Sequence, residues 1–172
     1  MDQAYRQVAD HYGFVCSGCE DNCCRTRFYH HTWVEYFYLR DGLDGMVETQ
    51  RQKCLQRATL VREKMADADA DGEKRRIMCP LNEDGRCVLY ERRPMICRLH
   101  GLPHFLRRPD GRVQIGPGCG EFENRCIPQE NNRLDRTPLY AGLAALEQRV
   151  RSHAGYAKKI RMTVADMLLA SI

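Results

Sequence analysis

The sequence predicts a small single domain that is mainly α, with irregular Cys-rich loops between its helices. The chain has 172 residues, which suits one domain with a true hydrophobic core. Apolar residues recur at helical spacing in several segments, most clearly in residues 44–66. Most of the ten cysteines lie instead in the less periodic parts of residues 16–120. Residues 134–172 form a C-terminal helical segment, with one helix from Pro138 and another from Thr163.

The N-terminal part is predicted to be helical on both sides of the first cysteines. Residues 1–14 have the pattern of a short amphipathic helix that leads into the first cysteine group. The aromatic segment 28–40 predicts a second helix. Thr32 is placed to cap it, because Glu35 follows three residues later as in a capping box. We expect the aromatic rings of this helix to lie in the core.

The longest helical pattern covers residues 44–66, with apolar residues on one spiral and charge elsewhere. Cys54 lies inside this pattern without a cysteine neighbour in sequence, so we expect a buried thiol there. Residues 67–72 imitate the start of a calcium-binding loop. An EF-hand would need Glu at the twelfth position, where this chain has Met78, so we expect an acidic turn instead.

The middle of the chain predicts short elements around cysteines. Residues 82–85 have turn chemistry between apolar pieces, which predicts a small hairpin or knuckle carrying Cys79 and Cys87. A short helix is expected to begin near Pro94. The glycines of residues 111–120 predict a loop-rich approach to the last cysteine of the cluster region.

Composition excludes several classes of protein. No apolar run approaches the roughly 18 residues that a membrane helix needs, and residues 1–14 lack the pattern of a signal peptide. We therefore expect a cytoplasmic protein without a membrane partner. The net charge of +4 is too mild to indicate nucleic acid. The basic runs 74–76 and 107–108 are typical of solvated faces, so we expect a protein partner of unknown identity.

The spacing of the cysteines indicates metal binding. Several structural disulfides are not expected in the reducing cytosol. Thiolates that lie close together repel one another and need a cation to hold them. The C-x-x-C pair at the start of the cluster lets a tight turn aim two sulfurs at one ion. The predicted metal-binding and cofactor-binding residues of region 16–120 are Cys16, Cys19, Cys23, Cys24, Cys79, Cys87, Cys97 and Cys119.

The number of metal sites stays open at this point. Neighbouring side chains in an extended segment point to opposite faces, so Cys23 and Cys24 would naturally serve different sites. Eight cysteines then divide into two sets of four, although the sequence does not say which four belong together. The alternative is one four-ligand site, with the remaining cysteines buried as small apolar residues.

The identity of the metal also stays open. Tetrahedral zinc and a [4Fe–4S] cluster are each satisfied by four thiolates. Guanidinium groups can hydrogen-bond sulfur and offset a buried anion. The arginines that lie beside cysteines in the sequence are Arg25, Arg86, Arg92, Arg93, Arg98 and Arg125.

The cysteine string, together with the element RP-x2-CR at residues 93–98, resembles the YkgJ-type cysteine-cluster family, also called the CxxCxxCC proteins. The resemblance covers about residues 16–120 and implies zinc or iron chelation by the eight cysteines. One departure is that three residues, not two, separate Cys19 from Cys23. Cys54 and Cys126 fall outside the pattern. A similar cluster in flagellin lysine methylases is associated with an iron–sulfur cluster, which favours iron.

Three functions follow from these observations. The first is a cytosolic, cysteine-ligated metal-binding protein that holds an iron–sulfur cluster, [4Fe–4S] in type, with a redox or structural role. The second is a zinc-stabilised binding module with four-cysteine sites and no redox activity. The third is an iron–sulfur-dependent enzyme related to flagellin lysine methylases, although no methyl-donor unit is evident. Catalytic residues are unknown; the candidate histidines are His30, His31, His100 and His104.

Overall fold

The structure is a computed structural model that describes residues 1–16 and 23–171. The described chain is a small single domain, about half helical, with a few short strands. The helices are α1 (Asp2–His11), α2 (Trp33–Asp44), α3 (Glu48–Ala70), α4 (Met95–Leu99), α5 (Gly120–Arg125), α6 (Thr137–Ala154) and α7 (Val164–Leu169). The strands are β1 (Asn82–Glu83), β2 (Arg86–Cys87), β3 (His104–Arg107), β4 (Val113–Gly116) and β5 (Leu134–Asp135). Single turns of 3-10 helix are η1 (Cys23–Arg25) and η2 (Tyr90–Arg92).

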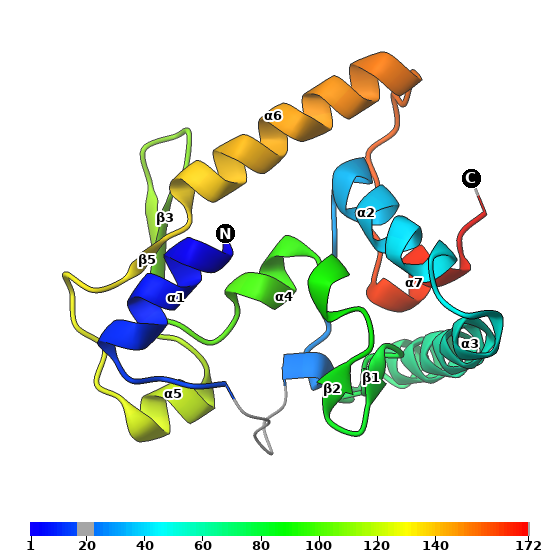
Figure 1. The fold of residues 1–172 in the computed structure, drawn as a ribbon, viewed down its shortest axis with the longest axis horizontal. Coiled ribbons are helices and arrows are strands. Elements are labelled where there is room, and N and C mark those ends of the chain that lie inside the picture. Colours follow the sequence, from blue (N-terminus) through cyan, green and yellow to red (C-terminus); the bar gives the residue numbers. More distant parts are fainter. Residues whose placement is uncertain (17–22, 172) are drawn as a thin grey trace.

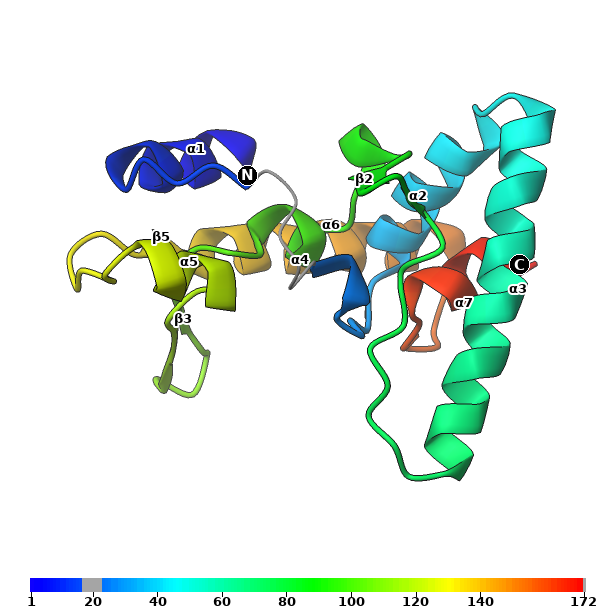
Figure 2. The same cartoon turned by 90° about the horizontal axis from the view of Figure 1, so that it is seen from below.

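The elements form two groups, which Figure 1 shows on opposite sides of the molecule. Helices α2, α3 and α7 pack together on one side, next to the β1–β2 hairpin. On the other side, α1 packs against α4 and β5, close to α5. Helix α6 spans both groups, because it contacts α2 at one end and β3 at the other. Figure 2 shows the same division from below, with α4 in the middle.

The first group has its own hydrophobic core. Leu39 of α2, Cys54 of α3 and Leu168 of α7 are completely buried in it. Helix α7 is held at its start by a capping box, because Thr163 accepts from the backbone N–H of Asp166 while the Asp166 carboxylate accepts from the backbone N–H of Thr163. The burial of Cys54 confirms the prediction of a buried thiol inside this helix.

Two smaller cores lie in the second group. One joins Phe14, Leu102 and Phe122, and the aromatic rings of Phe14 and Phe122 meet edge to face with centroids 5.2 Å apart. The other joins Met95 and Leu99 of α4 to Leu134. These cores contact α1 and α6 but not the core of the first group, so the space between the groups is not filled by a shared apolar core of described residues.

Helices α2, α4, α6 and α7 begin within about one residue of the predicted positions, whereas α3 begins at Glu48 rather than at residue 44. Thr32 accepts a hydrogen bond from the backbone N–H of Glu35, so α2 starts at Trp33. The predicted short helix near Pro94 is α4, which carries Cys97. Helix α3 extends further than predicted, because residues 67–70 form its last turn and the acidic turn itself begins at Asp71.

The predicted hairpin is present. Strands β1 and β2 pair through Asn82–Cys87 and Glu83–Arg86. Both central residues of the turn have positive φ, 49° at Asp84 and 82° at Gly85. Such a two-residue turn matches the right-handed twist of the paired strands, which is why Asp-Gly signals a hairpin.

The three-stranded sheet was not predicted. Strand β3 pairs antiparallel with β4 and parallel with β5. The segment that the glycines indicated as loop therefore contains β4. Gly116 is a glycine for a packing reason, because a Cβ there would lie 2.3 Å from Cε1 of His104 on the paired strand. Among the described residues, no helix has the length and apolar character needed to cross a membrane.

Candidate metal centre

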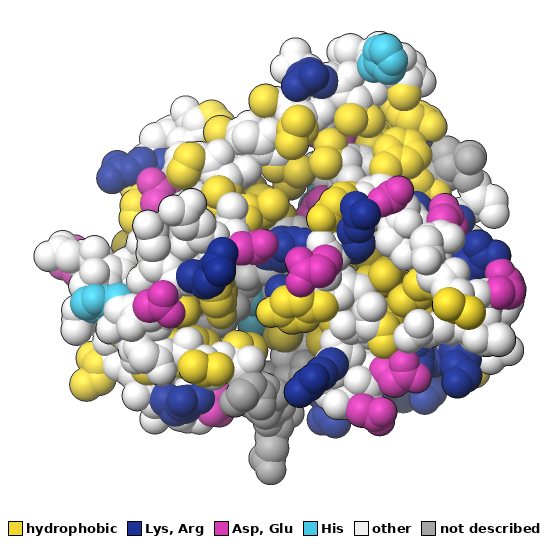
Figure 3. Space-filling view, viewed as in Figure 1, with side chains coloured by type: hydrophobic (Ala, Val, Ile, Leu, Met, Phe, Trp, Pro, Cys, Tyr) yellow, Lys and Arg dark blue, Asp and Glu magenta, His cyan; other side chains and the backbone are white. Residues whose placement is uncertain are grey.

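A large cavity lies between the two groups of elements. Its volume is about 1290 Å³, and its walls come from α1, η1, the β1–β2 hairpin, η2, α4 and the start of α5 and α7. Figure 3 shows this face hollowed between the groups, with acidic and basic side chains beside the hollow. The cysteines that line it are Cys16, Cys23, Cys24, Cys79, Cys87, Cys97 and Cys119. These are the predicted ligands apart from Cys19, which lies outside the described residues.

The two remaining cysteines provide a comparison. Cys54 is completely buried in the core of the first group, and Cys126 packs in the second group beside Tyr12. Neither of them lines the cavity. The sequence pattern therefore separated the cysteines that meet at the cavity from those that do not.

The β1–β2 hairpin positions three of the cavity cysteines. The backbone N–H of Cys79 donates to the carbonyl of Cys24 at 2.8 Å, which ties the hairpin to η1. The N–H of Asn82 then donates to the carbonyl of Cys79 at 3.0 Å, and Cys87 pairs with Asn82 across the strands. The side-chain Nδ2 of Asn82 is buried, and a hydrogen bond from the Asn82 side chain helps to lower the pKa of Cys24. An N–H donor of this kind is what a sulfur ligand of a metal centre accepts.

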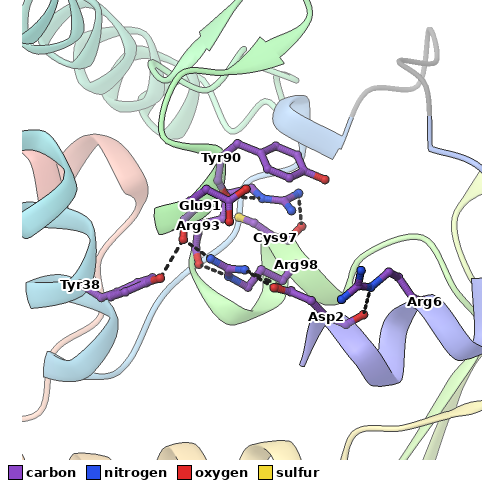
Figure 4. Close-up of polar contacts among 8 residues, drawn as sticks. All are labelled: Asp2, Arg6, Tyr38, Tyr90, Glu91, Arg93, Cys97 and Arg98. Atoms are coloured by element: carbon purple, nitrogen blue, oxygen red, sulfur yellow. Dashed lines mark hydrogen bonds and ion pairs between the residues drawn. The ribbon is translucent and has the colours of Figure 1, made fainter. Parts of the chain in front are cut away.

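Arg93 brings Cys97 of α4 to the same wall. Its Nη1 donates to the Cys97 carbonyl at 3.4 Å and its Nε to the Tyr90 carbonyl at 2.9 Å. The guanidinium carbon lies 3.5 Å from the centroid of the Tyr90 ring, so the cation is also held by the aromatic face. Figure 4 shows Arg93 between Tyr90 and Cys97, with Arg98 next to it.

Arg98 of α4 connects the start of α1 to η2 at the edge of the cavity. Its Nη1 lies 2.9 Å from Oδ2 of Asp2 at the start of α1, and its other nitrogens donate to the carbonyls of Glu91 and Arg93. Its side chain is only 8% exposed. Asp2 in the first turn of α1 also complements the positive end of that helix.

The opposite wall carries Cys119 and Cys16. The Sγ of Cys119 accepts from the backbone N–H of Phe122 at 3.4 Å and so caps α5. The N–H of Cys119 donates to the carbonyl of Gly101 at 3.0 Å. Gly101 has a φ of 109°, and a Cβ there would lie 3.3 Å from the Tyr5 hydroxyl and 3.9 Å from the Cys119 sulfur. Glycine at this position therefore lets the backbone approach the cavity closely.

Burial sets the acidity of the cavity thiols. It raises the pKa of Cys79 and Cys87, and it raises the pKa of Cys97 to about 12, with neighbouring thiols adding to the effect. Cys24 differs, because a hydrogen bond from the Cys23 thiol lowers its pKa to about 6. The pKa of Cys23 is raised in return. Without a cation, most of these thiols stay protonated; a thiophilic metal replaces their protons.

One expectation about the adjacent pair was wrong. Cys23 and Cys24 lie in the 3-10 turn η1 rather than in an extended segment, and their side chains hydrogen-bond to each other. The tight turn places both residues on the cavity. The argument from opposite faces of a strand therefore does not apply here.

Three of the six predicted arginines line the cavity, namely Arg86, Arg93 and Arg98. The others do not; Arg92, for example, forms an exposed ion pair with Asp41 at 2.9 Å. Sequence reasoning missed Tyr5 and Arg6 of α1, which also line the cavity. They lie far from most of the cysteines in the chain, and their helical pattern gave no signal of this role.

Of the candidate histidines, only His100 lines the cavity, where its ring meets Phe28 edge to face at 5.5 Å. His30 is buried, with Nδ1 3.6 Å from Oε1 of Glu35. His104 faces Gly116 in the sheet, and burial lowers its pKa. His31 is exposed and does not line the cavity.

The donor set fits a thiophilic metal, because seven cysteines from distant segments line one cavity. Within residues 1–16 and 23–171, no three His, Cys, Asp or Glu side chains are already assembled into a group that could hold a metal ion. Metal binding would therefore draw the described thiols closer together, as expected where ligation and folding are coupled.

Comparisons with known proteins give no match. No protein-family model matches the chain, and no curated protein and no solved structure matches it.

Proposed function

We propose that the protein binds metal through its cavity cysteines and holds an iron–sulfur cluster, with a redox or structural role. The observation that supports this most is the sorting of the cysteines. Seven of those in the sequence pattern line one cavity, whereas Cys54 and Cys126 lie elsewhere. If these cysteines were buried only as small apolar residues, there would be no reason for seven of them to line one cavity while Cys54 and Cys126 lie elsewhere.

The residues around the thiols suit an anionic centre. Arg93 lies against the wall that carries Cys97, and its charge favours the thiolate forms of Cys24, Cys87 and Cys97. The buried Nδ2 of Asn82 can donate to sulfur, and the hydrogen bond of this side chain already favours the thiolate of Cys24. An iron–sulfur cluster would supply one-electron chemistry here, with a potential set by such donors and by solvent access. These chain residues would hold the cluster, offset its charge and limit its contact with water.

The experiment is anaerobic purification followed by visible spectroscopy. We expect broad visible absorbance that bleaches with dithionite. Cys97→Ser should lose much of it, whereas Cys54→Ser should keep it, since Cys54 is equally a cysteine but lies outside the cavity. Equal loss in both variants, or a colourless parent protein, would contradict the iron–sulfur proposal.

Zinc is the second candidate, because the same thiols satisfy it. The cavity separates two groups of elements with separate cores, so a zinc ion held from both walls would stabilise their arrangement. Structural zinc supplies folding free energy on the order of 10–16 kcal/mol. A colourless protein that contains zinc and loses its helical signal upon chelation would favour this function over the redox role.

The enzyme alternative, similar to flagellin lysine methylases, is supported by the size of the cavity. At about 1290 Å³ it exceeds the roughly 300–1,000 Å³ of ordinary ligand pockets, so a metal centre leaves room beside it. His100 is the candidate histidine that faces this space. If the protein has an activity, His100→Gln should abolish it and leave the metal content unchanged.

A further inference from the structure

The β3–β4 hairpin forms an exposed edge of the three-stranded sheet. The strand order is β4-β3-β5, so β4 and β5 are its two edges. Strand β5 has only two residues and packs against α1. Strand β4, in contrast, is exposed from Val113 to Ile115, and Figure 2 shows its hairpin projecting from the second group of elements. An exposed edge strand presents backbone N–H and C=O groups that can pair with another strand.

The backbone groups of Val113 and Ile115 point away from β3. The N–H of Arg108 donates to the carbonyl of Arg112 at 2.8 Å, so these two residues form a hydrogen-bonded pair of the hairpin. Such pairs alternate with non-hydrogen-bonded pairs along an antiparallel ladder, so Gln114 belongs to the next hydrogen-bonded pair. Val113 and Ile115 belong to the other kind. Their N–H and C=O groups therefore face the open edge.

The side chains at this edge form a small apolar stripe on one face of the sheet. Val113 and Ile115 lie on the same face, because they are two residues apart in a strand, and they are 48% and 63% exposed. Phe105 of β3 lies opposite Ile115, and the guanidinium of Arg107 lies 5.6 Å from the centroid of the Phe105 ring. Residues 113–115 contain neither charge nor proline, which are the usual protections of an exposed edge.

We propose that β4 pairs with β4 of a second copy of this chain, antiparallel and about a two-fold axis at Gln114. Val113 of one copy then lies opposite Ile115 of the other. Each of these two equivalent pairs exchanges two backbone hydrogen bonds through its outward N–H and C=O groups. The apolar stripes of the two copies join into one. This proposal does not depend on the metal-binding function.

The register follows from the residues at the two ends of β4. A register centred on Val113 would place Gly111 opposite Ile115, but Gly111 has a φ of 83° and belongs to the hairpin turn. A register centred on Ile115 would place Pro117 opposite Val113, and proline has no N–H to donate. The register centred on Gln114 avoids both. The edge is thus complementary to itself, which favours a second copy over an unrelated strand.

The charges of the hairpin are compatible with this pairing. Arg112 lies opposite Gly116 of the second copy in this register, so arginines of the two copies do not face each other across the paired β4 strands. The charge of Arg112 is offset by Asp110, whose Oδ2 accepts from its Nε at 2.8 Å. Gln114 meets the same residue of the second copy at the axis, where the two side-chain amides can donate to each other.

The first test is sedimentation equilibrium of the protein, purified without oxygen and kept reduced so that disulfides do not link copies. Because the paired segment is short, we expect a weak dimer with a dissociation constant of roughly 10 µM to 1 mM. Ile115→Lys places a cation beside Arg107 of the second copy and should weaken the dimer by about tenfold. Leu60→Lys is the matched control, since Leu60 is also an exposed apolar residue but lies on α3.

The proposal is overturned if the parent stays monomeric up to about 1 mM, or if both lysine variants change the dissociation constant equally. Two double variants test the register. Val113→Glu/Ile115→Lys places opposite charges across the axis and should associate at least as well as Ile115→Lys alone. Val113→Lys/Ile115→Lys places like charges there and should be monomeric. Equal association of the two double variants, with circular dichroism showing both folded, would overturn the register.

A second measurement needs no variant. Amide hydrogen exchange of the parent is followed by nuclear magnetic resonance at low and high protein concentration. Protection of the Val113 and Ile115 amides should rise with concentration, because these N–H groups are bonded only in the dimer. The Gln114 amide faces β3 in each copy and should change less. Exchange at Val113 and Ile115 that does not depend on concentration would overturn the proposal.

Discussion

The backbone N–H of Cys79 donates a hydrogen bond of 2.8 Å to the carbonyl of Cys24. These residues are far apart in sequence, and the bond joins the first cysteine group to the β1–β2 hairpin. Through this bond, cysteines from two separate segments come to line the same cavity. The backbone therefore holds these two cysteine-bearing segments side by side without help from their thiols.

Arg93 should control retention of a metal bound by Cys24, Cys87 and Cys97. Arg93→Gln removes the cation near Cys24, Cys87 and Cys97, together with its bond to the Cys97 carbonyl. Loss of an outer partner of this kind typically weakens metal affinity by about 10–100-fold. The measurement is the rate of metal loss to a chelator. Arg92→Gln is the matched control, because Arg92 pairs with Asp41 outside the cavity; equal loss in both variants would contradict the role of Arg93.

Tyr5 should affect the reduction potential of the metal centre without being one of its ligands. Tyr5→Phe removes a buried hydroxyl beside Cys16 and Cys119. Hydrogen bonds to sulfur raise the reduction potential of a cluster, so we expect the variant to keep its iron and to have a lower potential. Tyr12→Phe is the control, since the Tyr12 hydroxyl bonds the carbonyl of Asn132 at 2.9 Å, away from the cavity. The potential is measured by redox titration. An unchanged potential in Tyr5→Phe would contradict the role proposed for Tyr5.

Gly101 should not tolerate a side chain. Its φ of 109° strains any other residue, and an added Cβ would press on the Tyr5 hydroxyl at 3.3 Å. We expect Gly101→Ala to lower the free energy of unfolding by about 1–3 kcal/mol. Gly142→Ala in α6 has nothing within 4 Å of the new Cβ and should instead stabilise the protein by about 0.5–1 kcal/mol. Urea unfolding of both variants checks this; opposite signs are the expected result, and equal effects would contradict it.

Glu35 should make stability dependent on pH at the acidic end. Burial opposes its charge, but the nearby His30 ring, the Thr32 hydroxyl and the backbone N–H of Met95 outweigh this and lower its pKa. Because the folded pKa lies below the unfolded value of about 4.3, the stabilisation is complete above that value and is lost as the pH falls through the folded pKa. Met95 begins α4, so this carboxylate also fixes the helix that carries Cys97.

The check on Glu35 is urea unfolding from neutral to acidic pH. Glu35→Gln keeps the size of the side chain and removes the charge, and it should cost about 1–3 kcal/mol at neutral pH. The difference between parent and variant should shrink as the solution becomes acidic. A difference that stays constant over the whole range would show that the charge of Glu35 does not contribute.

Much of the fold could be predicted from sequence because its signals are local. Thr32 and Thr163 mark helix starts within three residues, and the Asp84-Gly85 turn specifies its own hairpin. The sheet of β3, β4 and β5 could not be predicted in this way. Its parallel pair joins His104 to Leu134, and neither short strand carries a periodic pattern.

The candidate site was predicted in part for the same reason. Cysteine spacing separated the cavity thiols from Cys54 and Cys126. It could not reveal Tyr5, which reaches the cavity only because α1 packs against α4. The local geometry of Cys23 and Cys24 was also misjudged, because two adjacent residues carry too little pattern to distinguish a strand from a 3-10 turn.

The most direct test of the central proposal is the metal content of the protein purified without oxygen. Iron, acid-labile sulfide and zinc are measured per chain. The proposal predicts iron and sulfide in equal amounts, with about four of each for one [4Fe–4S] cluster and about eight for two. Zinc without sulfide, or a chain that contains no metal, would contradict an iron–sulfur protein.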